Sequence, residues 1–138
     1  MDDRQVSDIF ERRAFPGKTE PSRLLSTHIS WVILTPDYAF KIKKPVRFSF
    51  LDFSTRELRA HFCREEFRLN RRLAPDTYLG VLPIGWKDGF LHIGSRGRPA
   101  EDYAVWMRRE ENSRELDVLL RAGNVAREDI KKLAHKLA

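Results

Sequence analysis

The chain has 138 residues, of which 41% are hydrophobic and 33% charged, and it carries a formal net charge of +6. This composition predicts one soluble globular domain and excludes a disordered or low-complexity chain. The single cysteine, Cys63, excludes an intrachain disulfide, and no apolar run approaches the roughly 20 residues that cross a bilayer. We therefore expect a cytoplasmic protein without a membrane partner, and the positive charge favours an anionic partner such as a nucleotide.

The first third of the chain changes from helical to strand-like spacing. Val6 and Ile9 belong to a helical pattern over residues 5–14, which Phe15-Pro16-Gly17 ends. Three apolar runs follow, at residues 24–25, 29–34 and 38–46, with Thr35-Pro36-Asp37 as the turn between the last two. We predict a short docking helix followed by three antiparallel strands.

A long helix is predicted from residue 54 to residue 73. Ser54 and Glu57 have capping-box spacing, and Ala74-Pro75 ends the pattern. Four apolar residues at spacings of four, seven and four predict the face that packs on the sheet: Leu58, Phe62, Leu69 and Leu73.

The remaining sequence first returns to strands. Asp88-Gly89 separates apolar runs at 79–86 and 90–93, which predicts a hairpin, and residues 103–107 predict another strand. Helical spacing resumes from residue 116. The predicted fold is α+β: an antiparallel sheet of about five strands, one long helix after the third strand, and terminal helices. Residues 1–109 would form one lobe and residues 110–138 the start of a second.

This order of elements is the layout of a protein-kinase small lobe, in which a lysine on the third strand contacts the phosphates and a helix glutamate holds it. Strand alternation places Ala39, Lys41 and Lys43 on one face. Lys41 is the first choice because Ala39-Phe40-Lys41 matches the kinase Ala-x-Lys pattern, and Lys43 is the second. Helical geometry does not separate Glu65 from Glu66 as the partner.

Four runs carry a closer resemblance: residues 27–32, 38–46, 50–55 and 68–75. They are similar to the N-terminal portion of a bacterial branch of the aminoglycoside phosphotransferase family, some of whose members carry a second, P-loop domain. The resemblance implies a protein-kinase-like fold, with ATP and Mg²⁺ as the cofactors of the intact enzyme.

The resemblance also implies site residues. Glu66 precedes a run ending in Leu73-Ala74 at close to the family spacing, so Glu66 is carried over as the Lys41 partner. Residues 103–109 resemble the strand that leads into the hinge. Met107 would then line the adenine pocket, with Ala39 opposite and with Arg108 and Arg109 at the hinge.

Two departures from the family pattern bear on activity. The turn around Ser26, Thr27 and His28 lacks a glycine-rich signature, so its backbone amides and hydroxyls would have to cover the phosphates. The family's His-Gly-Asp loop, its downstream Asn and its metal-binding Asp have no counterpart in these residues. We therefore expect no catalytic residue or metal ligand in these residues. The missing second lobe would be a partner of the first lobe. Without it, we expect homo-oligomers that form through the surface which the second lobe would cover.

A basic nucleic-acid-binding module is the alternative function, although no zinc-ligand spacing or RNA-binding signature supports it. Its phosphate track would combine six cations: Lys43, Lys44, Arg47, Arg68, Arg71 and Arg72.

Overall fold

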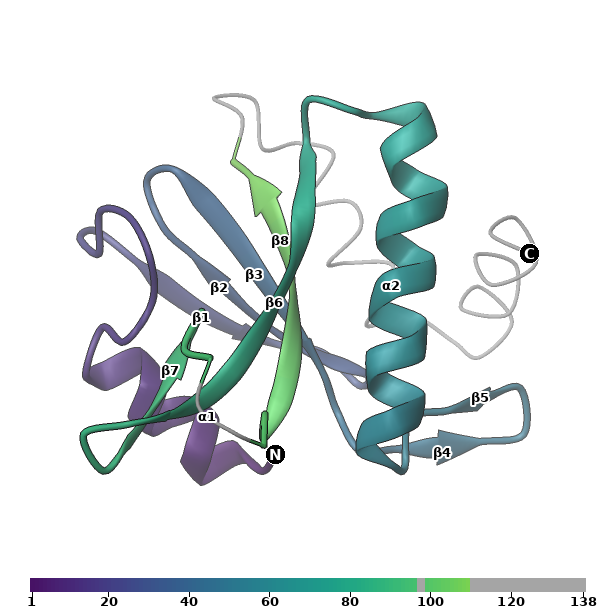
Figure 1. Ribbon diagram of the computed structural model, residues 1–138, viewed down its shortest axis with the longest axis horizontal. Helices are drawn as coiled ribbons and strands as arrows, with labels where there is room; N and C mark the ends of the chain where they lie inside the picture. Colours follow the sequence, from purple (N-terminus) through teal and green to yellow (C-terminus); the bar gives the residue numbers. More distant parts are fainter. Residues whose placement is uncertain (97–98, 110–138) are drawn as a thin grey trace.

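The computed structural model describes residues 1–96 and 99–109 (Figure 1), and the helices expected after residue 115 lie outside this part of the chain. Its six-stranded antiparallel sheet has the order β1-β2-β3-β8-β6-β7. The strands are β1 (Arg23–Ser26), β2 (Ser30–Leu34), β3 (Tyr38–Lys43), β6 (Tyr78–Lys87), β7 (Phe90–Ile93) and β8 (Asp102–Arg108). The two helices of this part of the chain are α1 (Asp3–Glu11) and α2 (Arg56–Leu73). The α+β class is confirmed.

The third strand is shorter than predicted. It ends at Lys43, where the prediction extended it to Val46, because Pro45 has no amide hydrogen and the Lys44 amide already donates to the Ile29 carbonyl. A small hairpin that was not predicted follows, formed by β4 (Arg47–Phe48) and β5 (Leu51–Asp52). This hairpin is a separate two-stranded sheet that leads into α2. The main sheet has six strands, where about five were predicted.

The hairpin predicted at Asp88-Gly89 is confirmed. Lys87 pairs with Phe90 across the turn, and the two residues between them have φ values of 52° and 84°. Glycine adopts this left-handed region without strain and aspartate tolerates it better than most residues, so the Asp-Gly pair fits the tight turn.

Both helices begin at residues other than those predicted. Asp2 forms a capping box with Gln5, so α1 starts two residues earlier than expected and ends at Glu11. The α2 N-cap is Thr55, whose hydroxyl accepts the Leu58 amide at 3.1 Å. Ser54, the predicted cap, instead donates its hydroxyl to Asp52.

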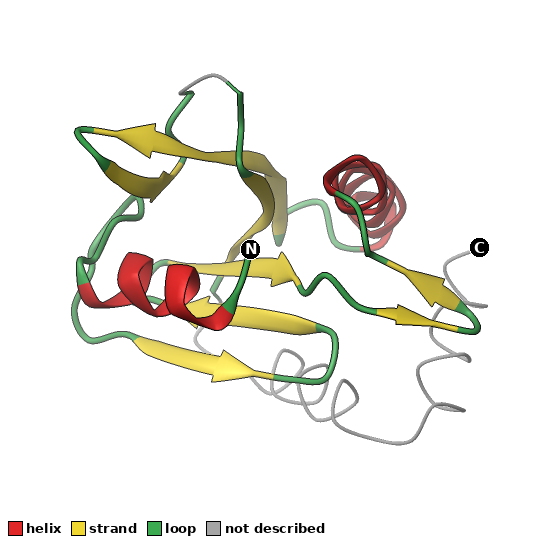
Figure 2. Ribbon diagram, turned by 90° about the horizontal axis from the view of Figure 1, so that it is seen from below, coloured by secondary structure: helices red, strands yellow, loops and turns green. Residues whose placement is uncertain are grey.

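Strand alternation divides the core into two layers, one on each face of the sheet. One layer contains Trp31, Phe40 and Ile42 with the buried face of α1, and Trp31 Nε1 donates to Asp3 of that helix at 2.7 Å. The other layer contains buried apolar residues of β2, β3 and β8 together with Cys63 of α2. Figure 2 shows the curled sheet with the two helices well separated.

The predicted apolar face of α2 is wrong. Leu73 is 83% exposed and Phe62 is 37% exposed, whereas the buried residues are Arg59, Ala60 and Cys63. The helix packs on β8 and β6 through small side chains and through polar groups that find ionic partners, so leucine periodicity does not mark its inner face. In the described part of the chain, neither helix has the length and apolar character that crossing a membrane requires.

Candidate functional site

The candidate site lies between β3 and α2, on the side of the sheet that α2 occupies. In the β2–β3 register Lys41 lies opposite Val32 and Lys43 lies opposite Ser30, so these four side chains share the face that α2 covers. Ala39 continues this face and pairs with Met107 of β8; both are buried. Two lysines and a strip of apolar residues are thus placed side by side by alternation alone.

Glu66 of α2 contacts both lysines. Its Oε1 lies 2.7 Å from Lys43 Nζ and 3.4 Å from Lys41 Nζ. The Lys43 side chain is 5% exposed and that of Glu66 is 11% exposed, whereas Lys41 is 28% exposed. The expected contact between Lys41 and Glu66 is therefore present, but the second-choice lysine makes the shorter and more buried ion pair.

The ionisation of these groups follows from their mutual attraction. Burial disfavours the charged carboxylate, yet the ammonium groups of Lys41 and Lys43 outweigh burial and hold the pKa of Glu66 at about 2. Burial is the largest single effect on Lys43 and acts to lower its pKa, but the attraction and hydrogen bond of Glu66, together with Cys63, raise the pKa above its ordinary value. The cluster therefore places two ammonium groups beside one carboxylate, and the ammonium group of Lys41 is the more exposed and the farther from Oε1.

The surroundings of this cluster are mostly apolar. Burial raises the pKa of the Cys63 thiol to about 11, so the thiol is neutral and unreactive at physiological pH. The Phe53 ring centroid lies 4.9 Å from Lys43 Nζ, close enough for a cation–π contact. Ser30 is buried, and its hydroxyl has no hydrogen-bond partner within the described ranges. A neutral donor thus lies on the same face as Lys43.

The turn predicted to cover the phosphates is held by hydrogen bonds between its own residues. The Thr27 hydroxyl accepts the amides of Ile29 and Ser30 at 3.3 and 3.0 Å, and the Thr27 amide donates to the Ser30 carbonyl. Ser26 accepts a hydrogen bond from Lys44 Nζ at 2.6 Å, and His28 is exposed. The Thr27 side chain is therefore used within the turn, and the structure brings Lys44 there, which the sequence did not indicate.

The two predicted hinge arginines hold the end of β8 in place. The Arg108 amide donates to the Thr77 carbonyl at 2.7 Å, and the Arg109 amide donates to the Asp37 carbonyl at 2.9 Å. The Arg109 guanidinium also donates to the Thr35 carbonyl. The backbone amides of Arg108 and Arg109 thus donate to carbonyls of the protein. Of the residues predicted to contact adenine, Ala39 and Met107 are the two on the same strand face as the lysines.

The structure separates the two glutamate candidates. Glu65 lies on the outer side of α2 and pairs with Arg68 at 2.7 Å, while Glu66 faces the sheet. The signal that finds Glu66 is its helical spacing of four and three in the series Arg59, Cys63 and Glu66, of which the first two are buried. This series is hard to recognise in a sequence because two of its three members are charged.

The six cations of the alternative nucleic-acid track do not form one free surface. Lys43 is buried against Glu66, Arg68 is paired with Glu65, and Lys44 is held at Ser26. Among residues 1–96 and 99–109, no three His, Cys, Asp or Glu side chains are grouped so that they could hold a metal ion.

Comparison with known proteins finds relatives but no family. The chain is 37% identical over 111 residues to uncharacterised proteins of Mycobacterium tuberculosis, strains H37Rv and CDC 1551, and of Mycobacterium bovis. The match covers 80% of this chain and 20% of each relative, so the chain spans about a fifth of the length of these proteins. No family model matches the chain, and no solved structure matches it.

Proposed function

We propose that residues 1–109 are the ATP-binding lobe of a kinase-like phosphotransferase of the aminoglycoside phosphotransferase type. The observation that carries the proposal is the ion cluster between the third strand and the following helix, formed by Lys41, Lys43 and Glu66. A lysine held by a helix glutamate is the arrangement with which kinases position nucleotide phosphates. The second lobe and the phosphate acceptor belong to the rest of such an enzyme.

The order of elements supports this proposal. Three antiparallel strands are followed by the hairpin β4–β5, the single long helix α2, and then β6, β7 and β8, with β8 inserted beside β3. This insertion places Met107 against Ala39, two residues from Lys41 on the same strand face. Ala39 and Met107 are both buried, so the adenine ring of the proposed nucleotide would reach them only after the side chains that cover them move.

The two lysines would divide the work. Lys43 is nearly buried and lies 2.7 Å from Glu66, so it holds the helix against the sheet. Lys41 is more exposed and its longer contact with Glu66 is weaker, so its ammonium group is the one that can turn to a phosphate oxygen. The excess positive charge of the cluster favours such an anion.

Replacing Lys41 with methionine tests this role. We expect Lys41→Met to weaken MgATP binding by the 138-residue chain roughly tenfold to a hundredfold, since a charge-assisted contact is lost. Its free energy of unfolding should change by no more than about 1 kcal/mol, because Lys43 still neutralises Glu66. Calorimetric titration and denaturant unfolding measure the two quantities.

The control for this experiment is Lys18→Met, which removes one exposed positive charge outside the ion cluster. It should leave MgATP affinity unchanged. Equal affinities of the Lys41 and Lys18 variants, or no MgATP binding by the unsubstituted chain at millimolar concentration, would count against the proposal.

We also expect that the 138-residue chain does not transfer phosphate. No residue in it corresponds to the catalytic base or the metal ligands that phosphoryl transfer requires. ADP release with MgATP should stay at the level of a protein-free blank. Magnesium-dependent turnover that copurifies with the chain would contradict this expectation.

A further inference from the structure

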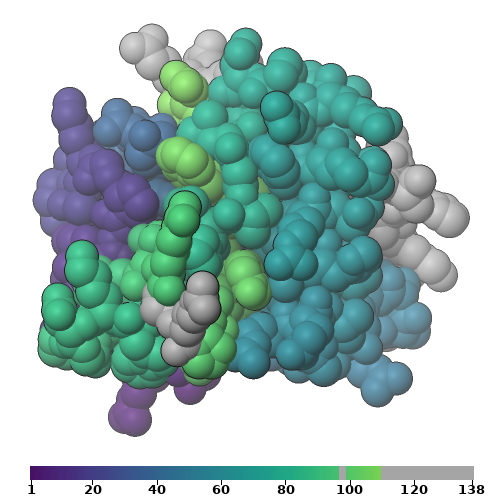
Figure 3. Space-filling view, in the orientation of Figure 1, coloured from purple at the N-terminus to yellow at the C-terminus, as the bar shows by residue number. Residues whose placement is uncertain are grey.

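A second basic region lies at the opposite edge of the sheet from β1, between the end of α1 and the β6–β7 hairpin. In Figure 3 this hairpin, in green, lies beside the N-terminal segment, in purple. A cleft of about 350 Å³ separates them, lined by residues 12–16, Lys87 and residues 92–95. Since β8 and β6 lie between β3 and β7 in the sheet, this cleft is separate from the Lys41–Glu66 cluster.

The walls of the cleft are held by backbone hydrogen bonds. The Ile93 amide donates to the Ala14 carbonyl at 2.9 Å, which fastens the segment after α1 along the outer edge of β7. The Gly94 amide donates to the Pro83 carbonyl at 2.7 Å. Arg13 occupies the left-handed region with φ of 54°, and its guanidinium donates to the Phe10 carbonyl. The cleft is therefore formed by the fold itself.

The lining carries three permanent positive charges, those of Arg12, Arg13 and Lys87, and includes no carboxylate. Arg12 pairs with Asp8 and Arg13 with Glu20, but both pairs are partly exposed and solvent screens them strongly. Neither pair therefore prevents the guanidinium groups from binding another anion.

The arginine geometry is suited to an oxyanion. The Arg12 guanidinium carbon lies 3.6 Å from the Phe90 ring centroid, which orients its plane, and its bond to Asp8 uses only Nε. Its two terminal nitrogens remain able to donate to further oxygens. Within the described residues no carboxylate lies within ion-pair distance of Lys87. A guanidinium fork beside a lysine is a combination that binds phosphate.

We propose that this cleft binds a small phosphate-bearing molecule, such as an oligophosphate or a phosphate ester. The positive charge of the lining favours an anion, and a volume of about 350 Å³ fits a small molecule rather than a folded partner. The site is independent of the ATP site proposed above, because it uses none of the same residues.

Pyrophosphate is the probe for the test. In an NMR titration of the 138-residue chain, we expect saturable shifts of the Arg12 and Arg13 side-chain signals and of the amides of residues 92–95. The double variant Arg12→Gln/Lys87→Gln should bind pyrophosphate at least about tenfold more weakly at this cleft. Shifts confined to residues around Glu66, or no saturation by about 10 mM, would overturn the proposal.

Two controls separate this site from general charge effects and from the proposed ATP site. Arg64→Gln/Arg71→Gln removes the same charge from the exposed side of α2 and should leave the cleft shifts unchanged. Lys41→Met should also leave them unchanged while it weakens MgATP binding. Equal weakening by both double variants, or equally tight binding of citrate, would show general anion attraction and overturn a phosphate site. Because the unsubstituted chain reports the shifts directly, a variant that fails to fold does not decide the question.

Discussion

Replacing Glu66 with glutamine is expected to lower the free energy of unfolding by about 3 to 5 kcal/mol, because the nearly buried Lys43 loses its counter-charge. The neighbouring substitution Glu65→Gln is the matched control. It removes an exposed pair with Arg68, which solvent screens, and should leave the free energy of unfolding nearly unchanged. Urea unfolding followed by circular dichroism measures both. Equal, small losses in the two variants would show that the Glu66 cluster does not stabilise the lobe.

The pH dependence of stability gives an independent check of the same cluster. The pKa of Glu66 is about 2 in the folded protein, below the ordinary value of 4.5. The unfolded chain therefore binds the proton more readily, so the stabilisation is complete above about pH 4.5 and is lost as the pH falls towards 2. In Glu66→Gln the free energy of unfolding should no longer fall between about pH 4.5 and pH 2 through this group. An unchanged slope between these pH values would contradict the assignment.

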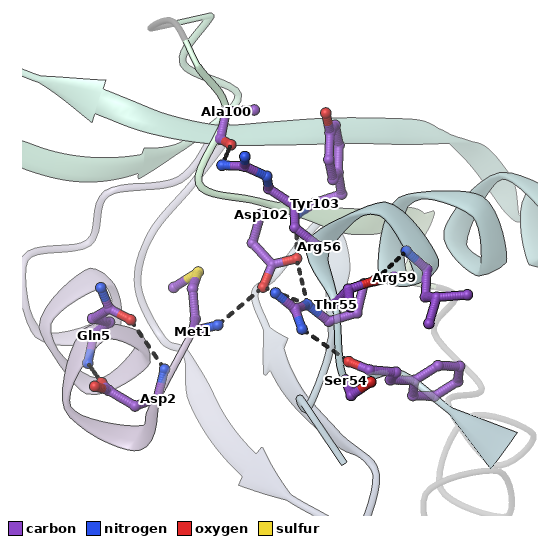
Figure 4. Close-up of polar contacts among 12 residues, drawn as sticks. Met1, Asp2, Gln5, Ser54, Thr55, Arg56, Arg59, Ala100, Asp102 and Tyr103 are labelled. Carbon is purple, nitrogen blue, oxygen red and sulfur yellow. Dashed lines mark hydrogen bonds and ion pairs between the residues drawn. The ribbon is translucent and has the colours of Figure 1, made fainter. Parts of the chain in front are cut away.

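A loss of similar size is expected for Asp102→Asn, at a second buried ion cluster (Figure 4). Asp102 is fully buried, with Arg59 Nε at 3.1 Å and the Met1 amino group at 3.2 Å from Oδ2. Arg59 also donates to the Phe53 carbonyl at 2.8 Å. Arg59 therefore links α2 both to β8 and to the residue that follows β5. Removing the carboxylate charge leaves a buried guanidinium unpaired, which costs about 3 to 5 kcal/mol.

The control for Asp102 is Asp52→Asn, which changes a carboxylate of the exposed β4–β5 hairpin. Its contact with Arg47 is 3.8 Å long and solvent screens it, so the free energy of unfolding should change far less than in Asp102→Asn. The double variant Asp102→Leu/Arg59→Met removes both charges together and should be more stable than Asp102→Asn. A double variant that is less stable than the single variant would show that the ions themselves are needed.

The sequence predicted the elements well where local chemistry decides them. The Asp88-Gly89 turn, the position of the long helix and the strand face shared by Ala39, Lys41 and Lys43 follow from turn preference and periodicity. The small hairpin at residues 47–52 was missed because two-residue strands carry no periodicity. The cap of α2 was placed one residue early because Ser54 and Thr55 have the same capping chemistry.

The site was predicted less completely because it depends on tertiary packing. The leucine stripe of α2 pointed to the wrong inner face, since Arg59 and Glu66 are buried by ion pairs with other strands. Such pairs join residues more than 20 positions apart, and no local pattern reports them. For the same reason the preference for Lys41 over Lys43 could rest only on the spacing to Ala39, and the sequence did not show which lysine would be nearer to Glu66.

The arrangement of one carboxylate beside two ammonium groups has a consequence for motion. Lys41 and Lys43 are two residues apart on β3, and such side chains are about 6.6 Å apart along a strand. A displacement of α2 parallel to β3 therefore lengthens one contact of Glu66 while it shortens the other. Under such a displacement Glu66 would keep one ammonium partner, whereas a movement of α2 away from the sheet would break both contacts together.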